Sequence, residues 1–371
     1  MFKFNVFLFS SVALAGVLTC PSVATRQEIR TLTSTQLTKY FNAVNALKDQ
    51  GNFYSESCAI HNDNVAQAHG VPAFFPWHRR FLRNYELALQ AIDPTIIIPY
   101  WDWTIDSQAP EQSTVLSSSY FGGNGRSSDN CLDEGPFSGW NSTIPDMHCL
   151  KRQYNSDDMI TAFYSPEAIE AILSQSTTYD QVHTSIEGGP HGAVHNGIGG
   201  DDGDMIFMYS PNDPIFYAHH AFIDLLWNEW QIRNPSLANT YTGESTDNMI
   251  PFNVPVSSVF NTKASGFCYT YPRWNANLPA AQLSSLHRRQ DNTLTSLIDI
   301  LKSNIAQLIS IAPTDRTTHQ KIRTPSPLPQ AYIDKNNLNI DKVRSNEKSL
   351  ARLVETLNAT PNFVPKAHLK L

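Results

Sequence analysis

The chain has 371 residues, of which 41% are hydrophobic and 11% aromatic, so it can bury one large core with an appendage. A formal net charge of −7 gives it no basic field for nucleic acid, and the sequence contains no internal repeat and no nucleotide-binding motif. These features indicate a globular protein without a nucleic-acid partner.

The first residues, MFKFNVFLFSSVALAGVLTC, place one lysine before an apolar run that ends in small residues. This pattern is typical of a secretory signal peptide and differs from a membrane span. We place the signal peptide at residues 1–18 and expect a secreted product with no membrane association. Its cysteines would then lie in an oxidising compartment. The sequence leaves their connectivity open, and we expect the pairs Cys131–Cys149 and Cys20–Cys58.

A helix is predicted next, capped by Ser34 and carrying apolar residues at helical spacing, namely Leu37, Phe41, Val44 and Leu47. It leads into CAIHNDNVAQAHGVPAFFPWHRRFLRNYELALQ, which holds His61, His69 and His78. The residues after His78 continue an apolar helical stripe through Phe81, Leu82 and Tyr85, so His78 is expected on a buried helix face.

Two connecting segments follow. The stretch IIIPYWDWT at 96–104 is predicted to be a short buried connection, and residues 105–160 form a long insertion. The insertion contains a glycosylation sequon at Asn141, which should lie on the surface. Such insertions often shape the mouth of a binding site, and the alternative is a loop that only covers the core.

A second histidine triplet begins in EGGPHGAVHNG. His191 and His195 are four residues apart and project from one side of a helical turn, which Pro190 could begin. His219 stands in SPNDPIFYAHHAFIDLLWNEW, where Asn212 or Asp213 can cap a helix that Pro214 opens. His220 is about 100° away from His219 on that helix and is not expected to bind the same ion.

Six histidines in two triplets indicate a paired metal centre, although a lone histidine is more often an ordinary core or surface residue. No glutamate stands between His191 and His195, as in HExxH zinc proteases, and none stands three residues before any of the six. An all-imidazole set suits copper best, with zinc as the fallback. Five other histidines have no partner at ligand spacing and are interpreted as ordinary polar residues: His148, His183, His287, His319 and His368.

The segments HGVPAFFPWHRRFLRNYE, PHGAVH and SPNDPIFYAHHAFIDLLW resemble the two copper-binding signatures of the tyrosinase and polyphenol oxidase family, and most closely its short secreted fungal members. The resemblance runs from about Arg26 to Arg273. It implies a mainly α fold whose central helical bundle holds a binuclear copper site, with long loops around it. It also implies two copper ions, one held by His61, His69 and His78 and the other by His191, His195 and His219.

By the same resemblance, Glu187 is a candidate base that acts through an ordered water, and the alternative is a carboxylate that only stabilises a helix start. Relatives that hydroxylate monophenols often have Asn directly after the first ligand of the second site. Here that residue is Gly192, and an asparagine stands instead at Asn196. This departure favours diphenol oxidation over monophenol hydroxylation.

Three further residues have expected roles near the site. Asp224 is expected to accept a hydrogen bond from a metal-binding imidazole, with a surface ion pair as the alternative. In the family the residue corresponding to His220 tends to face the substrate opening, and the alternative is a core or capping hydrogen bond. Glu86 is expected to be a buried partner of an arginine such as Arg79.

Tyr269 and Tyr271 look like the Tyr-x-Tyr element that ends the catalytic domain in this family, so we assign residues 19–275 to that domain. Residues 276–371 are then a C-terminal helical extension, with helices predicted at Leu294–Ile309 and around Val343–Leu357. In relatives such an extension can act as a lid or propeptide, and Arg288 and Arg289 form a conceivable processing point. Two helices packed permanently on the core are the alternative.

The function expected from the sequence is a secreted, copper-dependent phenol oxidase that acts on small phenolic substrates and dioxygen. It would oxidise o-diphenols, and conceivably hydroxylate monophenols, to o-quinones. The alternatives are a dioxygen carrier of the haemocyanin type and a non-catalytic, zinc-stabilised secreted protein. The sequence leaves the phenol and the oligomeric state open.

Overall fold

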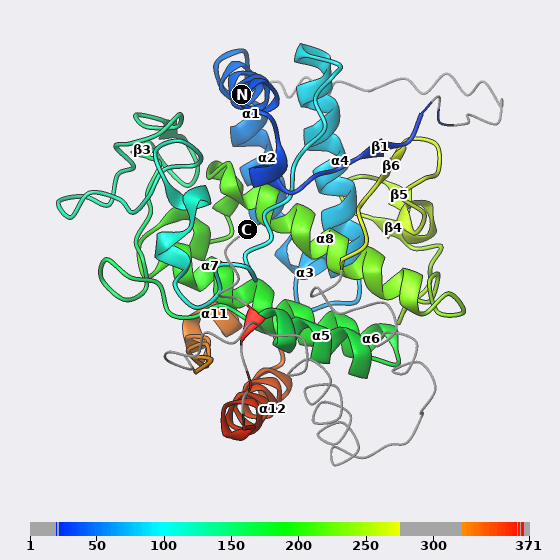
Figure 1. Cartoon of the computed structure of the whole chain (residues 1–371). Helices are drawn as coiled ribbons and strands as arrows, with labels where there is room; N and C mark the ends of the chain where they lie inside the picture. The colour runs from blue at the N-terminus through cyan, green and yellow to red at the C-terminus, as the bar shows by residue number, and fades with distance from the viewer. Residues whose placement is uncertain (1–19, 21, 275–320, 362, 364, 367–371) are drawn as a thin grey trace.

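The computed structural model describes residues 20, 22–274, 321–361, 363 and 365–366 (Figure 1). The expected signal peptide, the helix expected at Leu294–Ile309 and the Arg288–Arg289 pair lie outside the described residues. In the described part the chain is mainly helical, as the sequence predicts. Its α-helices are α1 (Ser34–Asp49), α2 (Phe53–Asp63), α3 (Val65–Ala68), α4 (Phe74–Ile92), α5 (Pro166–Gln175), α6 (Tyr179–Ile186), α7 (Gly192–Gly199), α8 (Ile215–Arg233), α11 (Gln330–Lys335) and α12 (Ile340–Ala359).

The strands are short and form three two-stranded sheets. β1 (Ala24–Thr25) runs parallel to β6 (Tyr269–Thr270), with Ala24 opposite Tyr269. The other two sheets are antiparallel and pair β2 (Asn141–Ser142) with β3 (His148–Cys149), and β4 (Asn248–Met249) with β5 (Val254–Pro255). Six short 3₁₀ turns complete the described part: Ile29–Thr31, Pro110–Gln112, Thr114–Leu116, Asp204–Ile206, Ser210–Asn212 and Val256–Val259.

Helices α4 and α8 pack against each other at the centre of the molecule (Figure 1). The apolar stripe predicted after His78 is buried along α4, and α8 is buried on nearly every side. A helix that is apolar all round is stable only inside a core. Helices α4 and α8 therefore lie inside the core, where five tryptophans are fully buried, namely Trp77, Trp101, Trp103, Trp227 and Trp230.

The N-cap of the first helix, α1, lies one residue earlier than the sequence predicts. Thr33, not Ser34, is the capping residue: its hydroxyl accepts from the Gln36 backbone N–H at 3.2 Å, and the Gln36 amide oxygen accepts from the Thr33 N–H at 2.9 Å. This reciprocal pair satisfies two backbone donors at once. Ser34 cannot form it, because the residue three positions later is Leu37.

Two disulfides form, one local and one between distant segments. Cys131–Cys149 forms as predicted, whereas Cys20 pairs with Cys268 and not with Cys58. The parallel pairing of β1 with β6 brings Cys20 beside Cys268, which sequence spacing alone could not reveal. Cys58 is a buried free thiol whose Sγ lies 2.9 Å from Asn212 Oδ1.

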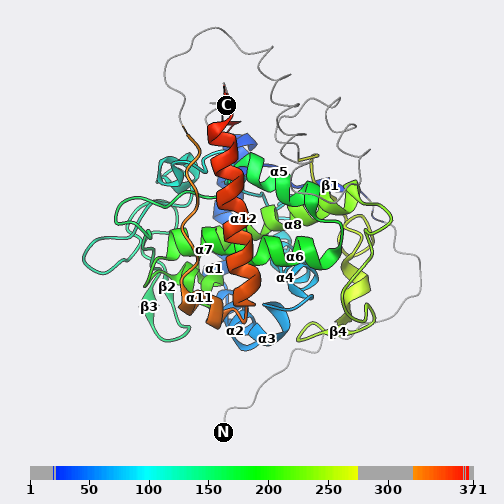
Figure 2. The same cartoon turned by 90° about the horizontal axis from the view of Figure 1, so that it is seen from below.

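The described part of the C-terminal extension crosses the helical core. Helix α12, which confirms and lengthens the helix predicted around Val343–Leu357, packs on α5, on α6 and on the turn at Glu187–His191 (Figure 2). Lys342 Nζ forms an ion pair with Asp180 at 3.0 Å, and the Asn346 amide donates to the Thr184 carbonyl at 3.3 Å. The extension therefore covers the side of the core on which the second histidine triplet begins.

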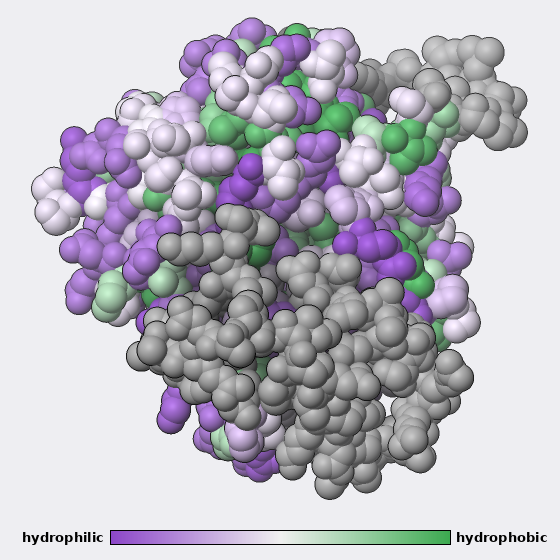
Figure 3. Space-filling view, in the orientation of Figure 1, coloured by the Kyte–Doolittle hydropathy of each residue, from purple (hydrophilic) through white to green (hydrophobic). Residues whose placement is uncertain are grey.

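The face shown in Figure 3 is mostly hydrophilic where its residues are coloured, with hydrophobic residues gathered in a small area above the centre. Among the described residues, no helix is both long and apolar enough to cross a membrane.

Candidate metal centre

The six predicted histidines come together in two adjacent groups, joined by a seventh. One group contains His61, His69 and His78, and the other contains His191, His195, His219 and His220. Within each group, one ring nitrogen of every member lies within 4.8 Å of the others. All seven side chains are buried, none being more than 4% exposed. Residues more than a hundred positions apart in sequence thus meet at one place in the core.

The first group is directed inward by its hydrogen bonds. His61 Nδ1 lies 2.6 Å from the Met208 carbonyl, and His78 Nδ1 lies 2.8 Å from the Phe74 carbonyl. A carbonyl only accepts, so Nδ1 carries the proton in each ring and Nε2 is left with a lone pair for a metal. The Nε2 atom of His61 lies 3.0 Å from that of His69 and 3.3 Å from that of His78.

The second group begins at a turn. Glu187–His191 forms a wide π turn between α6 and α7, with a kink at Gly189, so Pro190 lies inside this turn and not at the first residue of α7. The His191 Nδ1 lies 3.2 Å from the Glu187 carbonyl, and the His195 Nδ1 lies 2.6 Å from the Met205 carbonyl. Both rings therefore direct Nε2 away from the backbone, as in the first group.

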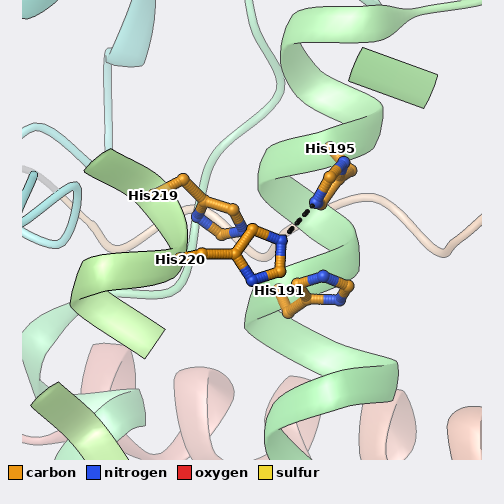
Figure 4. A group of neighbouring side chains, drawn as sticks. All are labelled: His191, His195, His219 and His220. Carbon is orange, nitrogen blue, oxygen red and sulfur yellow. Dashed lines mark hydrogen bonds between the residues drawn. The ribbon is translucent and has the colours of Figure 1, made fainter. Parts of the chain in front are cut away.

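His219 and His220 both reach the second group (Figure 4). The helical phase of 100° that separates His219 from His220 places only the Cα atoms, and the rings of both residues converge on the same group. His220 Nε2 lies 3.4 Å from His195 Nε2, and its ring stacks on that of His78, with centroids 4.4 Å apart. At 1% exposure His220 does not face a solvent-filled opening.

Burial favours the uncharged form of most of these imidazoles. Desolvation, followed by the charge of neighbouring histidines, lowers the pKa of His61, His78, His191 and His220 well below the ordinary 6.5. The pKa of His195 also falls, to about 4, and burial is the main cause. Neutral imidazole is the metal-binding form, so the groups are ready for a cation near neutral pH.

The donor set also fits copper. The Nε2 atom of His191 and both ring nitrogens of His219 are buried without a hydrogen-bond partner among the described residues, which is rare for polar atoms in a native core. A metal held by the second group would satisfy the Nε2 atom of His191. Neither group includes a carboxylate or a thiolate, and an all-imidazole set of three or four ligands per ion suits copper.

Glu187 lies beside both groups. Its Oε1 accepts from the Gly70 N–H at 2.8 Å and lies 3.4 Å from His69 Nδ1, while its Oε2 lies 2.8 Å from His183 Nε2. Burial alone would raise the pKa of Glu187, but hydrogen bonding and charge from His183 and His69 outweigh it and lower the pKa below 4.5. Glu187 is therefore an ionised carboxylate held against a candidate ligand.

Asp224 does not hold an imidazole, contrary to the sequence expectation. Its carboxylate accepts from Arg79 Nε at 2.5 Å and from the hydroxyls of Tyr269 and Tyr271 at 2.6 and 2.8 Å. Arg26 adds an ion pair at 3.3 Å. These four donors surround Asp224 because α8 turns it toward β6 and away from the histidines, so its role is to join the chain ends to the core.

Glu86 is buried and paired with arginine, but not with Arg79. Its Oε2 lies 2.9 Å from Arg26 Nη2 and 2.7 Å from Arg83 Nη1. Arg79 is taken by Asp224 on the facing helix. A sequence pattern can identify a buried charge, but it cannot choose between two arginines on the same helix face.

The C-terminal extension lies over Gly192. A Cβ placed on Gly192 would come 2.7 Å from Leu328 Cδ1 and 3.0 Å from Tyr332 Cε1, and the Tyr332 ring lies 6.3 Å from that of His195. A pocket of about 10 Å³ lies beside this contact, and its lining includes Tyr164, Gly189 and Leu328 but none of the seven histidines. Asn196, which follows His195, is buried and accepts from the Gly200 N–H through its carbonyl.

Sequence reasoning missed three residues at this site. Leu328 and Tyr332 belong to no motif and approach only because α11 folds back onto α7, so no sequence signal could have placed them. His183 was interpreted as an ordinary polar residue. Its spacing of four residues before Glu187 on a helix was the available signal, because residues i and i+4 face each other.

Comparison with known proteins agrees with this geometry. The family domain described as the common central domain of tyrosinase matches residues 40–233. Tyrosinase ustQ of Aspergillus flavus is 32% identical over 292 residues, which cover 68% of this chain and 80% of that protein. A tyrosinase of Streptomyces antibioticus is 31% identical over 285 residues, covering 70% and 95%.

Two solved structures share the fold. A mutant polyphenol oxidase from Thermothelomyces thermophila matches with a TM-score of 0.57 and 22% identity, covering 67% of this chain and 89% of that one. A functional unit of Octopus hemocyanin matches with a TM-score of 0.57 and 20% identity, covering 71% and 72%. With a helical core, two converging histidine groups and a matched central domain, the chain belongs to the tyrosinase family of binuclear copper oxidoreductases.

Proposed function

We propose that this protein oxidises o-diphenols to o-quinones with dioxygen at a centre of two copper ions. The observation that carries the proposal is the direct contact between the two histidine groups, in which the rings of His78 and His220 stack with centroids 4.4 Å apart. Two ions held by rings in contact can act on the same small substrate. Bound copper would supply the electron transfer, since two catechols give up four electrons to reduce one dioxygen to water.

The first copper is assigned to His61, His69 and His78, and the second to His191, His195 and His220. His220 replaces His219 in this assignment because its Nε2 is 3.4 Å from that of His195, close to the spacings inside the first group. Its ring also bridges toward His78. His219 lies behind it, and neither of its ring nitrogens has a hydrogen-bond partner among the described residues.

Glu187 is our candidate to accept the proton that a phenol loses on binding, by way of a water. The support is its position, since it is an ionised carboxylate in contact with the candidate ligand His69. Gly192 lies beside the second copper site and presents no side chain to position such a water. This supports oxidation of diphenols as the main activity, with monophenol hydroxylation weaker.

The extension is proposed to restrict access to the centre. Leu328 and Tyr332 pack on Gly192, the residue directly after the candidate ligand His191. Displacement or cleavage of residues 276–371 would then be needed for full activity. The two disulfides support secretion, because such bonds persist in oxidising compartments.

The test is oxygen uptake by copper-loaded protein, uncut and cut after Arg289, with a catechol and with the matching monophenol. Uptake with catechol by the cut protein supports the proposal, and equal uptake by the uncut protein would remove the restricting role of the extension. Zinc as the bound metal in protein purified from its native source would support the non-catalytic alternative.

A dioxygen carrier remains the second candidate, since the hemocyanin unit shares the fold with the same TM-score as the polyphenol oxidase. Reversible oxygen binding without quinone formation, in the cut protein as well as the uncut, would favour the carrier.

A further inference from the structure

An eighth buried histidine lies next to the metal centre. His183 is on α6, one helical turn before Glu187, and is 2% exposed. Its ring lies among Phe74, Phe75 and Tyr179, with centroids 6.0 to 6.2 Å away. A phenylalanine would fill this space without burying a polar atom. The presence of a histidine therefore indicates that its ring nitrogens have a role.

The hydrogen bonds order His183 and Glu187 into a chain. A carboxylate accepts, so the His183 Nε2 must carry a proton and donate it to Glu187 Oε2 at 2.8 Å. The other carboxylate oxygen accepts from the Gly70 N–H at 2.8 Å and faces His69 Nδ1 at 3.4 Å. The carboxylate therefore points at His69 because it is held from the other side.

His69 lacks supports that most of the other candidate ligands have. It lies on extended backbone after α3, with φ −128° and ψ 144°, whereas His61, His78 and His220 are within helices. The rings of His61, His78, His191 and His195 each have Nδ1 near a backbone carbonyl. Among the described residues, Nδ1 of His69 has no hydrogen-bond partner, and it lies 3.4 Å from Glu187 Oε1.

We propose that His183 is a positioning residue for the first copper, acting through Glu187 to orient His69. The inference rests on the proposed function, because it requires His69 to be a copper ligand. A carboxylate behind a metal-bound imidazole fixes its tautomer and ring orientation and increases its basicity, and loss of such a partner typically weakens metal binding. His183 supplies the donor that keeps the carboxylate in place.

The experiment compares three variants of the full-length chain with the wild type. His183→Phe keeps the ring volume and removes the donor, His183→Gln keeps an amide donor, and Glu187→Gln removes the carboxylate. Copper(II) is titrated into metal-free protein against a chelator of known affinity, and the melting temperature of each metal-free protein is measured alongside. We expect His183→Phe to bind one of the two coppers about 10- to 100-fold more weakly, with the second unchanged. His183→Gln should be close to the wild type.

A matched control separates positioning from general stability. Glu170→Gln on α5 removes a buried carboxylate that pairs with Arg233 at 2.7 Å and has no contact with a histidine. It should lower the melting temperature without changing copper affinity. In a Glu187→Gln background, His183→Phe should add no further loss.

Three results would overturn the inference. His183→Phe could bind both coppers as tightly as the wild type, it could weaken both in parallel with its melting temperature, or its effect could persist undiminished in the Glu187→Gln background. In each case a wild type that binds two coppers leaves the proposed function standing. A wild type that binds no copper would overturn both.

Discussion

Leu328 occupies the space that a side chain on Gly192 would need: a Cβ there would come 2.7 Å from the Leu328 Cδ1 atom. Gly192 is therefore small enough to fit beneath Leu328 of the extension. A larger residue at 192 and a seated extension exclude each other.

Gly192→Asn should accordingly displace the extension. We expect faster oxygen uptake with a catechol by the uncut protein, faster proteolysis between residues 275 and 320, and a loss of about 1–3 kcal/mol in unfolding free energy from overpacking. Gly192→Ala is the comparison, because its single methyl meets only the Leu328 and Tyr332 side chains and should displace the extension less than the longer Asn side chain does. Unchanged proteolysis of Gly192→Asn would show that the extension does not depend on this contact.

Separate replacement of His219 and His220 tests the ligand assignment. His220→Asn should bind one copper per chain, whereas His219→Asn should keep two, because the His220 Nε2 lies 3.4 Å from the His195 Nε2. Metal analysis after dialysis gives the stoichiometry. The reverse result would return the third ligand position to His219.

Asp224→Asn should destabilise the fold without affecting the metal. Removing the charge leaves Arg26 and Arg79 buried beside a neutral amide, which we expect to cost about 3–5 kcal/mol in urea unfolding. Asp129→Asn breaks the exposed pair with Arg126 and should cost no more than about 1 kcal/mol. Loss of copper from Asp224→Asn at a temperature where it remains folded would argue for a role at the centre.

Metal-free protein should lose stability as the pH falls from 6.5 toward 4. Burial lowers the pKa of His195 to about 4 in the folded state, so below 6.5 the unfolded chain takes up protons that the folded chain refuses. The other lowered histidines add to the effect in the same direction. Urea unfolding across this pH range measures the loss of stability. Near neutral pH, free copper at 100 times its dissociation constant should add about 2.7 kcal/mol to the unfolding free energy. A flat profile without metal would mean that the rings are not buried as described.

His148 should show the opposite dependence. A hydrogen bond to the buried Asp204 raises the pKa of His148, although partial burial opposes the shift. The protonated ring therefore stabilises the fold below pH 6.5, and the benefit is lost as the pH rises through its raised pKa. The difference in unfolding free energy between the wild type and His148→Gln should be larger at pH 5.5 than at pH 8.5. Equal differences would mean that the ring stays neutral.

Local patterns predicted the elements that carry the site. The stripe after His78 and the apolar run around His219 each place a histidine on a helix that must be buried, and the spacing of His191 and His195 places both on one face. These inferences need only the helical repeat. The long, strongly periodic helices were accordingly predictable from sequence.

The features that could not be predicted depend on contacts between distant segments. Cys20 pairs with Cys268 because two strands 245 residues apart run parallel, and Asp224 meets Arg26 across 198 positions of sequence. The role of His220 depends on how far a ring can turn from its Cα position. Tertiary packing determines these pairings and ring orientations, and the residue spacing within a single segment does not reveal it.

The anchoring of the described extension has a further consequence. Cys20–Cys268 and the β1–β6 pair fix the chain near residue 270 to the core, while residues 321–361 are held by contacts such as Leu328 on Gly192 and Lys342 with Asp180. In the intact chain the tether keeps the local concentration of the extension high. A single cut between 275 and 320 would turn this segment into a separate, reversibly bound peptide. The cut protein would then become more active on simple dilution, and the intact protein would not.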